Sequence, residues 1–150
     1  MSFTTEKDYD GNKKIVGRKR FIVTDTLGLI LALLIVPANT GEREGAFHAF
    51  AKLKDCFSRL VKILADQGFS GVEFIQRIRD TYNLIVEVVV QVLGKGSFQV
   101  LPKRWIVERT FGWLMFHRRL TKDYEVKIAH SEAFIYWAMI RIMSKKCRGT

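Results

Sequence analysis

A run of eight consecutive apolar residues, Leu29 to Val36, ends at Pro37 and constrains the fold more than any other part of the chain. The run is too short to span a bilayer, which takes about twenty residues in a helix. We therefore expect a buried β-strand. A second strand is predicted at Lys19 to Thr24, and the turn Asp25-Thr26-Leu27-Gly28 separates the two. Two strand-like runs joined by a glycine-containing turn predict a β-hairpin.

Helical and strand-like segments alternate after the hairpin. We expect a helix near 42–58, a strand at 60–65, a helix at 71–80, a strand at 84–90, a helix at 105–117 and a last helix from Ser131 onward. The order β-β-α-β-α-β-α-α predicts a mixed α/β sheet flanked by helices, and 150 residues suit a single domain.

Two details of the C-terminal helices are predicted from the spacing of apolar residues. In the helix at 105–117, Val107, Phe111 and Leu114 recur at i, i+4 and i+7 and are expected to face the core. The last helix, capped by Ser131, has an apolar centre at 133–140 and is expected to be largely buried.

The charge of the chain favours a polyanionic partner. Lys and Arg number 25 against 15 Asp and Glu, which gives a formal net charge of +10. Nucleic acid is the first candidate partner, and an anionic membrane surface is the second. Cys56 and Cys147 lie far apart and predict reduced thiols of a cytoplasmic protein rather than a zinc site. The first residues lack an apolar stretch of signal-peptide type.

Two carboxylates occupy positions suited to phosphodiester chemistry. Asp66 closes an apolar strand just before a turn bracketed by Gly68 and Gly71, and Glu108 follows Arg104 by one helical turn. Such chemistry uses two divalent ions about 4 Å apart, held by carboxylates because Mg²⁺ prefers oxygen ligands. Each residue also has a simpler explanation. Asp66 could only form the turn, and Glu108 could pair with Arg104 at the surface, which is worth about 0.3–0.5 kcal/mol.

Basic residues gather in three parts of the chain: before the first strand, around Glu108 and at the C-terminus. The C-terminal group is expected to be a solvated tail. In the other two we expect contacts to DNA phosphates from Lys13, Lys14, Arg18, Lys19, Arg104, Arg109, Arg118 and Arg119. Binding of this kind is largely non-specific and weakens steeply as salt rises.

Three blocks of sequence resemble the catalytic domain of bacterial insertion-sequence DDE transposases. They are Asp10 to Gly28, Ala65 to Gly71, and Leu101 to Leu114 continuing into Arg118 to Glu125, and they occur in the family's order. The resemblance implies a ribonuclease-H-like fold in which Asp66 is the second acidic residue of the catalytic triad and Glu108 the third. It also implies two Mg²⁺ or Mn²⁺ ions as cofactors. The implied partner is double-stranded DNA, at element ends and target, in a bacterial cytoplasm and at its nucleoid.

The chain departs from the family pattern in three places. Leu101 stands where many members carry tyrosine, and Met115 stands where a basic residue is expected. The family's first aspartate lies on a central first strand, which we expect to be missing or reduced to a stub at residues 2–7. Residues 1–17 are thus predicted to be loop or stub and 18–150 the folded core.

The missing aspartate leads to an expectation about activity. Asp8 and Asp10 are unaligned stand-ins for it, and Asp25 is expected to be structural. We therefore expect the chain alone not to cleave DNA.

Three functions stay open at this point. The first is a transposase that acts as a homo-oligomer or pairs with a full-length copy. The second is a non-catalytic DNA-binding remnant that modulates a full-length transposase. The third is a stand-alone ribonuclease-H-like nuclease.

Overall fold

The computed structural model describes residues 8–10, 15–54, 56–89 and 103–148. Its strands are β1 (Asp8–Asp10), β2 (Ile15–Thr24), β3 (Ile30–Pro37), β4 (Lys62–Ala65) and β5 (Ile85–Val88). Its helices are α1 (Glu42–Lys54), α2 (Val72–Tyr82), α3 (Arg104–Met115) and α4 (Ile128–Cys147), with short 3₁₀ turns η1 (Gln67–Phe69) and η2 (Arg118–Leu120). The predicted order of elements is confirmed, with β1 and the two 3₁₀ turns added.

The predicted hairpin is formed by β2 and β3, which pair antiparallel. Asp25 organises the turn, because its Oδ1 accepts the backbone N–H groups of Leu27 and Leu29 at 2.8 Å each. Gly28 has φ +82°, a conformation that glycine adopts without strain. The expectation that Asp25 is structural is confirmed.

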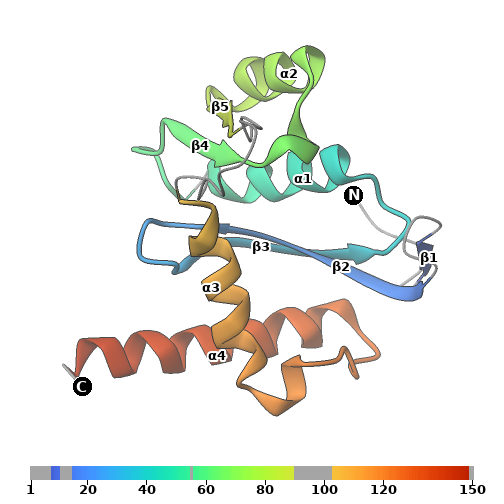
Figure 1. The fold of residues 1–150 in the computed structure, drawn as a ribbon, viewed down its shortest axis with the longest axis vertical. Helices are drawn as coiled ribbons and strands as arrows, with labels where there is room; N and C mark the ends of the chain where they lie inside the picture. The colour runs from blue at the N-terminus through green and yellow to red at the C-terminus, as the bar shows by residue number, and fades with distance from the viewer. Residues whose placement is uncertain (1–7, 11–14, 55, 90–102, 149–150) are drawn as a thin grey trace, which may run out of the picture.

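Two hydrophobic cores lie on opposite faces of the hairpin. In Figure 1, α1 lies on one side of β2 and β3 and α4 on the other. On the α1 side, Phe50 and Leu53 pack with Ile78 of α2 and Val86 of β5. On the α4 side, the buried core consists of Leu33, Ile35, Leu114, Leu120, Ile135 and Ala138. The eight-residue apolar run can supply both cores because alternate strand residues point to opposite faces.

Strand β4, helix α2 and strand β5 form a separate βαβ unit. β4 and β5 pair in parallel, from Lys62 opposite Ile85 to Ala65 opposite Val88. Parallel neighbours need a crossover connection, which α2 supplies. Asn83 ends α2 in the left-handed region at φ 54°.

The described strands form two sheets, whereas one mixed sheet was expected. Within the described residues, β1, β2 and β3 form one sheet and β4 and β5 form another. No described strand lies between β2 and β4 to connect them by hydrogen bonds. Residues 2–7, the predicted stub of a central strand, lie outside the described residues.

The predicted boundary at residue 18 is also corrected. β2 begins at Ile15, and β1 pairs antiparallel with its first three residues, Asp8 opposite Gly17. The reason is a second short hairpin, whose polar sequence resembles a loop although its backbone pairs as strands. Asp8 and Asp10 therefore lie in β1 and not in a loop.

The buried face of α3 is displaced from the prediction by one residue. Ile106, Thr110 and Leu114 are buried, whereas Val107 is exposed and Phe111 is half-buried. Thr110 can lie inside because its hydroxyl donates to the carbonyl oxygen of Gly28 at 2.8 Å. Burying a hydroxyl that has a hydrogen-bond partner costs little free energy. Thr110 can therefore belong to the buried face of α3, where the apolar spacing predicted Val107 and Phe111.

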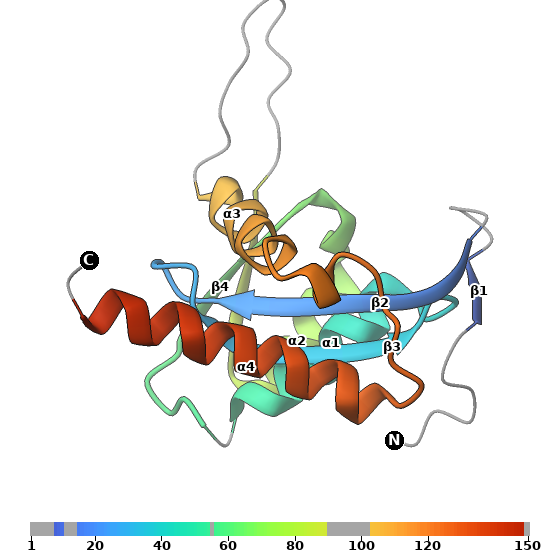
Figure 2. The ribbon, with the colours of Figure 1, turned by 90° about the horizontal axis from the view of Figure 1, so that it is seen from below.

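Two expectations for the last helix are wrong. α4 begins at Ile128, one turn before Ser131, so Ser131 is buried within the helix and does not cap it. Trp137 is 70% exposed and Ile140 63% exposed, which contradicts burial on nearly every side. The helix lies along one face of the hairpin (Figure 2), and Leu114 of α3 and Leu120 of η2 join its buried side. No described helix is long and apolar enough to cross a membrane.

Candidate functional site

Asp66 lies where the sequence placed it, directly after β4. It caps the 3₁₀ turn η1, and its Oδ1 accepts the backbone N–H of Gly68 at 3.0 Å. The residue is exposed. Asp66 therefore forms the turn, as the simpler explanation required, and still presents a carboxylate at the carboxyl end of a parallel strand.

Glu42 brings a second carboxylate to this end of β4. A Cβ atom built on Gly68 would lie 2.9 Å from Glu42 Oε2 and 3.2 Å from Asp66 Oδ1. Sequence reasoning missed this neighbour. The available signal was its position at the first residue of α1, since a helix N-terminus stabilises a carboxylate there. Bringing α1 and β4 together, however, requires the tertiary fold.

The two carboxylates are the kind of ligand that binds a divalent cation, but they are fewer than such a site needs. Oxygen ligands are what Mg²⁺ prefers, and Glu42 and Asp66 supply them. Within the described ranges, no group of three His, Cys, Asp or Glu side chains could hold a metal ion. The described part of the site is thus a partial set of metal ligands.

A cavity of about 580 Å³ separates β2 from the end of β4, and we call it the inter-sheet groove. Six consecutive residues of β2, Gly17 to Ile22, line one side, and Asp66 and Phe69 line another. Val107 and Phe111 of α3 complete the wall. Glu108 follows Val107 on α3 and is exposed, but its own side chain is not part of the lining. The structure thus places α3 and Asp66 on the same groove without showing contact between Asp66 and Glu108.

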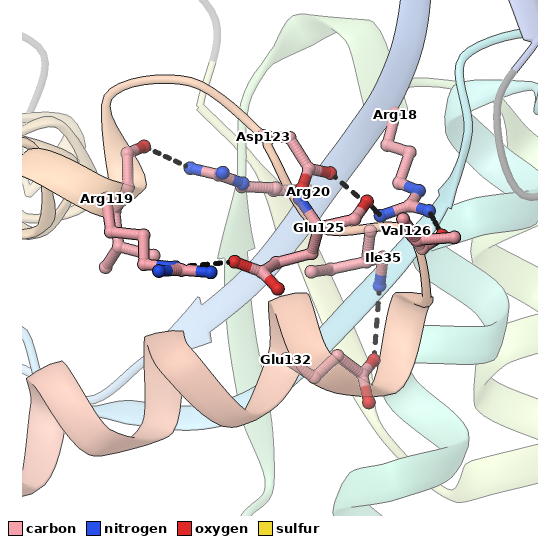
Figure 3. Close-up of polar contacts among 9 residues, drawn as sticks. Arg18, Arg20, Ile35, Arg119, Asp123, Glu125, Val126 and Glu132 are labelled. Carbon is pink, nitrogen blue, oxygen red and sulfur yellow. Dashed lines mark hydrogen bonds and ion pairs between the residues drawn. The ribbon is translucent and has the colours of Figure 1, made fainter.

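Arg18 is anchored inside the protein. Its Nη1 donates to Asp123 Oδ2 at 3.1 Å and to the carbonyl oxygen of Glu125 at 3.0 Å, and its Nη2 donates to the carbonyl oxygen of Val126. Figure 3 shows this guanidinium enclosed by the segment that follows η2. The Arg18 side chain is 1% exposed. These contacts stabilise the fold, and a phosphate contact from Arg18 stays a prediction that would require their release.

Arg20 is held in a similar way two residues further along the same strand. Its Nη1 donates to the carbonyl oxygen of Leu120 at 2.9 Å (Figure 3). Burial lowers the pKa of the Arg20 guanidinium, and the negative charge of Asp123 partly offsets this effect. Arg18 and Arg20 share one face of β2 because side chains two apart in a strand point the same way.

Arg109 is clamped between two tryptophans. Its guanidinium carbon lies 4.5 Å from the Trp105 ring centroid and 4.7 Å from that of Trp113. Its Nη2 donates to the carbonyl oxygen of Leu27 at 2.9 Å. On the far end of α4, Lys146 lies 4.2 Å from the Trp113 centroid. Arg109 therefore ties α3 to the hairpin turn, and stacking of this kind also stabilises the cation.

The remaining predicted DNA contacts differ in how freely they face solvent. Arg118 is exposed. Arg119 is 61% exposed, although its Nε donates to Glu125 at 2.7 Å and its guanidinium lies over Phe134. Lys19 donates to the carbonyl oxygen of Thr40 at 2.9 Å. Lys13, Lys14 and the side chain of Arg104 lie outside what the structure describes.

A carboxylate pair at a strand end and the cations of β2 line one groove of a mixed α/β protein. The family model of the transposase DDE domain matches residues 2–143. Because the match covers nearly the whole chain, the protein belongs to the DDE transposase family, as the sequence resemblance predicted. No curated protein and no solved structure matches the chain.

Proposed function

We propose that this chain is the DNA-processing domain of an insertion-sequence transposase and that its fold is of the ribonuclease-H type. The family match carries the proposal. The geometry supports it in two ways. Asp66 stands at the carboxyl end of a parallel strand, and α3, which bears Glu108, lines the same groove.

Asp66 and Glu108 are the residues that would hold the divalent ions of this family. Two such ions, when bound, neutralise charge at both oxygens of the phosphodiester under attack. The remaining work falls to the basic side chains. Arg118 and Arg119 lie just beyond the C-terminal end of α3, where they would hold phosphates of double-stranded DNA and fix its position relative to Glu108.

The proposal includes inactivity of the isolated chain. A DDE site needs a third carboxylate, and no residue of the sequence aligns with the family's first aspartate. We therefore expect DNA binding without cleavage unless the first aspartate is supplied. A non-catalytic protein that modulates a full-length transposase would also bind DNA without cleaving it. The two functions differ when the first aspartate is supplied, because the non-catalytic protein would still not cleave.

DNA binding is tested by fluorescence anisotropy with a 30-base-pair duplex of arbitrary sequence. With about four phosphate contacts, affinity should fall roughly a hundredfold between about 50 and 200 mM salt. The double variant Arg118→Ala/Arg119→Ala should bind more weakly and show a shallower salt slope. Lys145→Ala/Arg148→Ala, which changes two exposed cations at the C-terminal end of α4, is the matched control and should change affinity much less. An affinity that does not depend on salt would contradict the proposed binding mode.

Cleavage is tested by nicking of supercoiled plasmid in the presence of Mg²⁺ or Mn²⁺. We expect none from the isolated chain. If the chain nicks the plasmid and Glu108→Ala does not, the proposed role of Glu108 is supported. The proposed inactivity of the isolated chain is then contradicted. Cleavage of an RNA–DNA hybrid, and not of duplex DNA, would instead support a stand-alone nuclease.

A further inference from the structure

The outer face of α4 carries a stripe of exposed apolar side chains, which we call the α4 seam. Its members are Ala133, Tyr136, Trp137, Ile140 and Met143. They recur at i, i+3, i+4, i+7 and i+10, and residues at these intervals lie on one side of a helix. Figure 2 shows α4 in front of the hairpin, and the opposite side of the helix packs into the second core. The seam is therefore a second apolar face on one helix.

The residue types of the seam are those found where proteins bind one another. A single exposed apolar residue is ordinary, whereas a continuous exposed stripe marks an interaction surface. Trp, Tyr and Met are enriched at the centres of protein interfaces, and Trp and Tyr contribute much of the binding energy. Trp137 is 70% exposed and Ile140 63% exposed. Large apolar side chains of this kind gain little from the phosphate backbone of duplex DNA, so a protein partner suits them better.

Three cations border the seam on one side. Arg141, Lys145 and Arg148 follow Trp137 by four, eight and eleven residues, which places them in one row beside it. All three are exposed. The ion pairs among the described residues are made by other side chains. The row therefore complements a partner that carries carboxylates.

Charge disfavours a second copy of the chain as the occupant. A symmetric pair brings one face against the same face of its partner, so the cations would meet one another. Glu132 is the one acidic residue of α4, and its Oε1 already accepts Lys52 Nζ at 3.1 Å and the N–H of Ile35 at 3.3 Å (Figure 3). A lipid surface also fits less well, because a helix that lies in a membrane buries a broad apolar face, and the seam is narrow.

We propose that the outer face of α4 binds an amphipathic α-helix of a partner protein, with carboxylates along one edge of that helix's apolar stripe. Apolar residues at alternating intervals of three and four are those through which two helices pack side by side. The row of Arg141, Lys145 and Arg148 would meet the carboxylates and set the orientation of the partner helix. The interaction needs neither DNA nor metal, so it does not rest on the proposed function.

The test uses the full 150-residue chain and fluorescently labelled synthetic helices, with binding followed by anisotropy. The first probe is a three-heptad peptide with leucine at positions a and d, glutamate along one edge and alanine elsewhere. The second probe replaces each glutamate with lysine, and the third scrambles the first so that no stripe remains. The glutamate probe should bind. The other two should bind at least about tenfold more weakly, because one meets like charge and the other cannot pack along the seam.

Two matched protein variants locate the site. Ile140→Glu should abolish binding of the glutamate probe. Val72→Glu makes the same change of charge at an 85% exposed valine on α2 and should leave binding intact. Both positions are exposed, and circular dichroism checks that both variants fold. The double variant Arg141→Glu/Arg148→Glu should weaken the glutamate probe at least about tenfold and strengthen the lysine probe.

Several outcomes would overturn the proposal. They are a glutamate probe that does not bind, a scrambled probe that binds equally well, and an Ile140→Glu variant that binds like the parent chain. A dimer in sedimentation that Ile140→Glu converts to monomer would assign the face to a second copy. Binding to phosphatidylserine-containing vesicles that Trp137→Ala removes would assign it to a membrane. A lower affinity of Ile140→Glu than of Val72→Glu for duplex DNA would assign it to DNA.

Discussion

At the residue scale, strand alternation decides how the charges of β2 are used. Arg18 and Arg20 point to the side occupied by η2 and the segment after it, and both make hydrogen bonds there. Lys19, between them, points to the other face and reaches Thr40. Cations that lie together in the sequence therefore have different roles: some anchor the fold from inside, and others lie at the surface. Charge counting could not separate them, because the covering segment lies about one hundred residues later in the chain.

The pairing of Arg18 with Asp123 should contribute strongly to stability. Arg18 is 1% exposed and Asp123 18% exposed at their side chains, so removing one charge leaves the other buried without its counter-ion. Asp123→Asn should lower the free energy of unfolding by about 2–3 kcal/mol, measured by urea denaturation. Asp80→Asn, an exposed change on α2, should shift it by less than about 0.5 kcal/mol. Equal effects of the two substitutions would contradict the anchoring role.

The sequence predicted the local setting of Asp66 but not the contacts that it makes with distant segments. The position of Asp66 at a strand end followed from an apolar run that stops before a glycine-containing turn. Its neighbour Glu42 could not be found in this way, because the two carboxylates meet only through the packing of α1 against η1. The relation of Asp66 to Glu108 stays a prediction.

At the element scale, the helices show why an apolar pattern gives the position of a helix but not always its buried face. The spacing in α3 predicted Val107, Phe111 and Leu114 inside, yet Thr110 is fully buried through its bond to Gly28. For α4, apolar content predicted burial on nearly every side. Its exposed Trp137 and Ile140 show that composition cannot tell how many faces neighbouring elements cover.

Two glycines should respond in opposite directions to replacement by alanine. An added Cβ at Gly112, within α3, meets no atom within 4 Å. Gly112→Ala should therefore raise the free energy of unfolding by about 0.5–1 kcal/mol, because alanine loses less backbone entropy in a helix. At Gly28, φ is +82° and the new Cβ would lie 2.8 Å from Thr110 Oγ1. Gly28→Ala should lower the free energy of unfolding by at least about 1–2 kcal/mol.

Chemical denaturation of both variants against the parent chain tests this pair. A loss of stability in Gly112→Ala would show that α3 does not tolerate a methyl group at that position. An unchanged Gly28→Ala would show that the hairpin turn relaxes around the new side chain.

At the scale of the whole molecule, the order of elements and the hairpin were predictable because each depends on residues close in sequence. The division of the sheet was not, since it depends on which strands meet across the groove. The family resemblance supplied the expectation of a central strand. The described residues show only that β2 and the turn after β4 line the same groove.

The two cores on opposite faces of the hairpin have a consequence for the order in which the protein opens. The core around Ile78 and Val86 joins α1, α2, β4 and β5 to the hairpin, whereas the core around Ile135 joins it to α4. Because the βαβ unit packs on the hairpin through the first core and α4 packs through the second, the βαβ unit can detach while the hairpin and α4 stay packed. Native-state amide hydrogen exchange should then show two cooperative units, with β4 and β5 exchanging before β3. A single exchange rate across all these strands would mean that the protein opens as one unit.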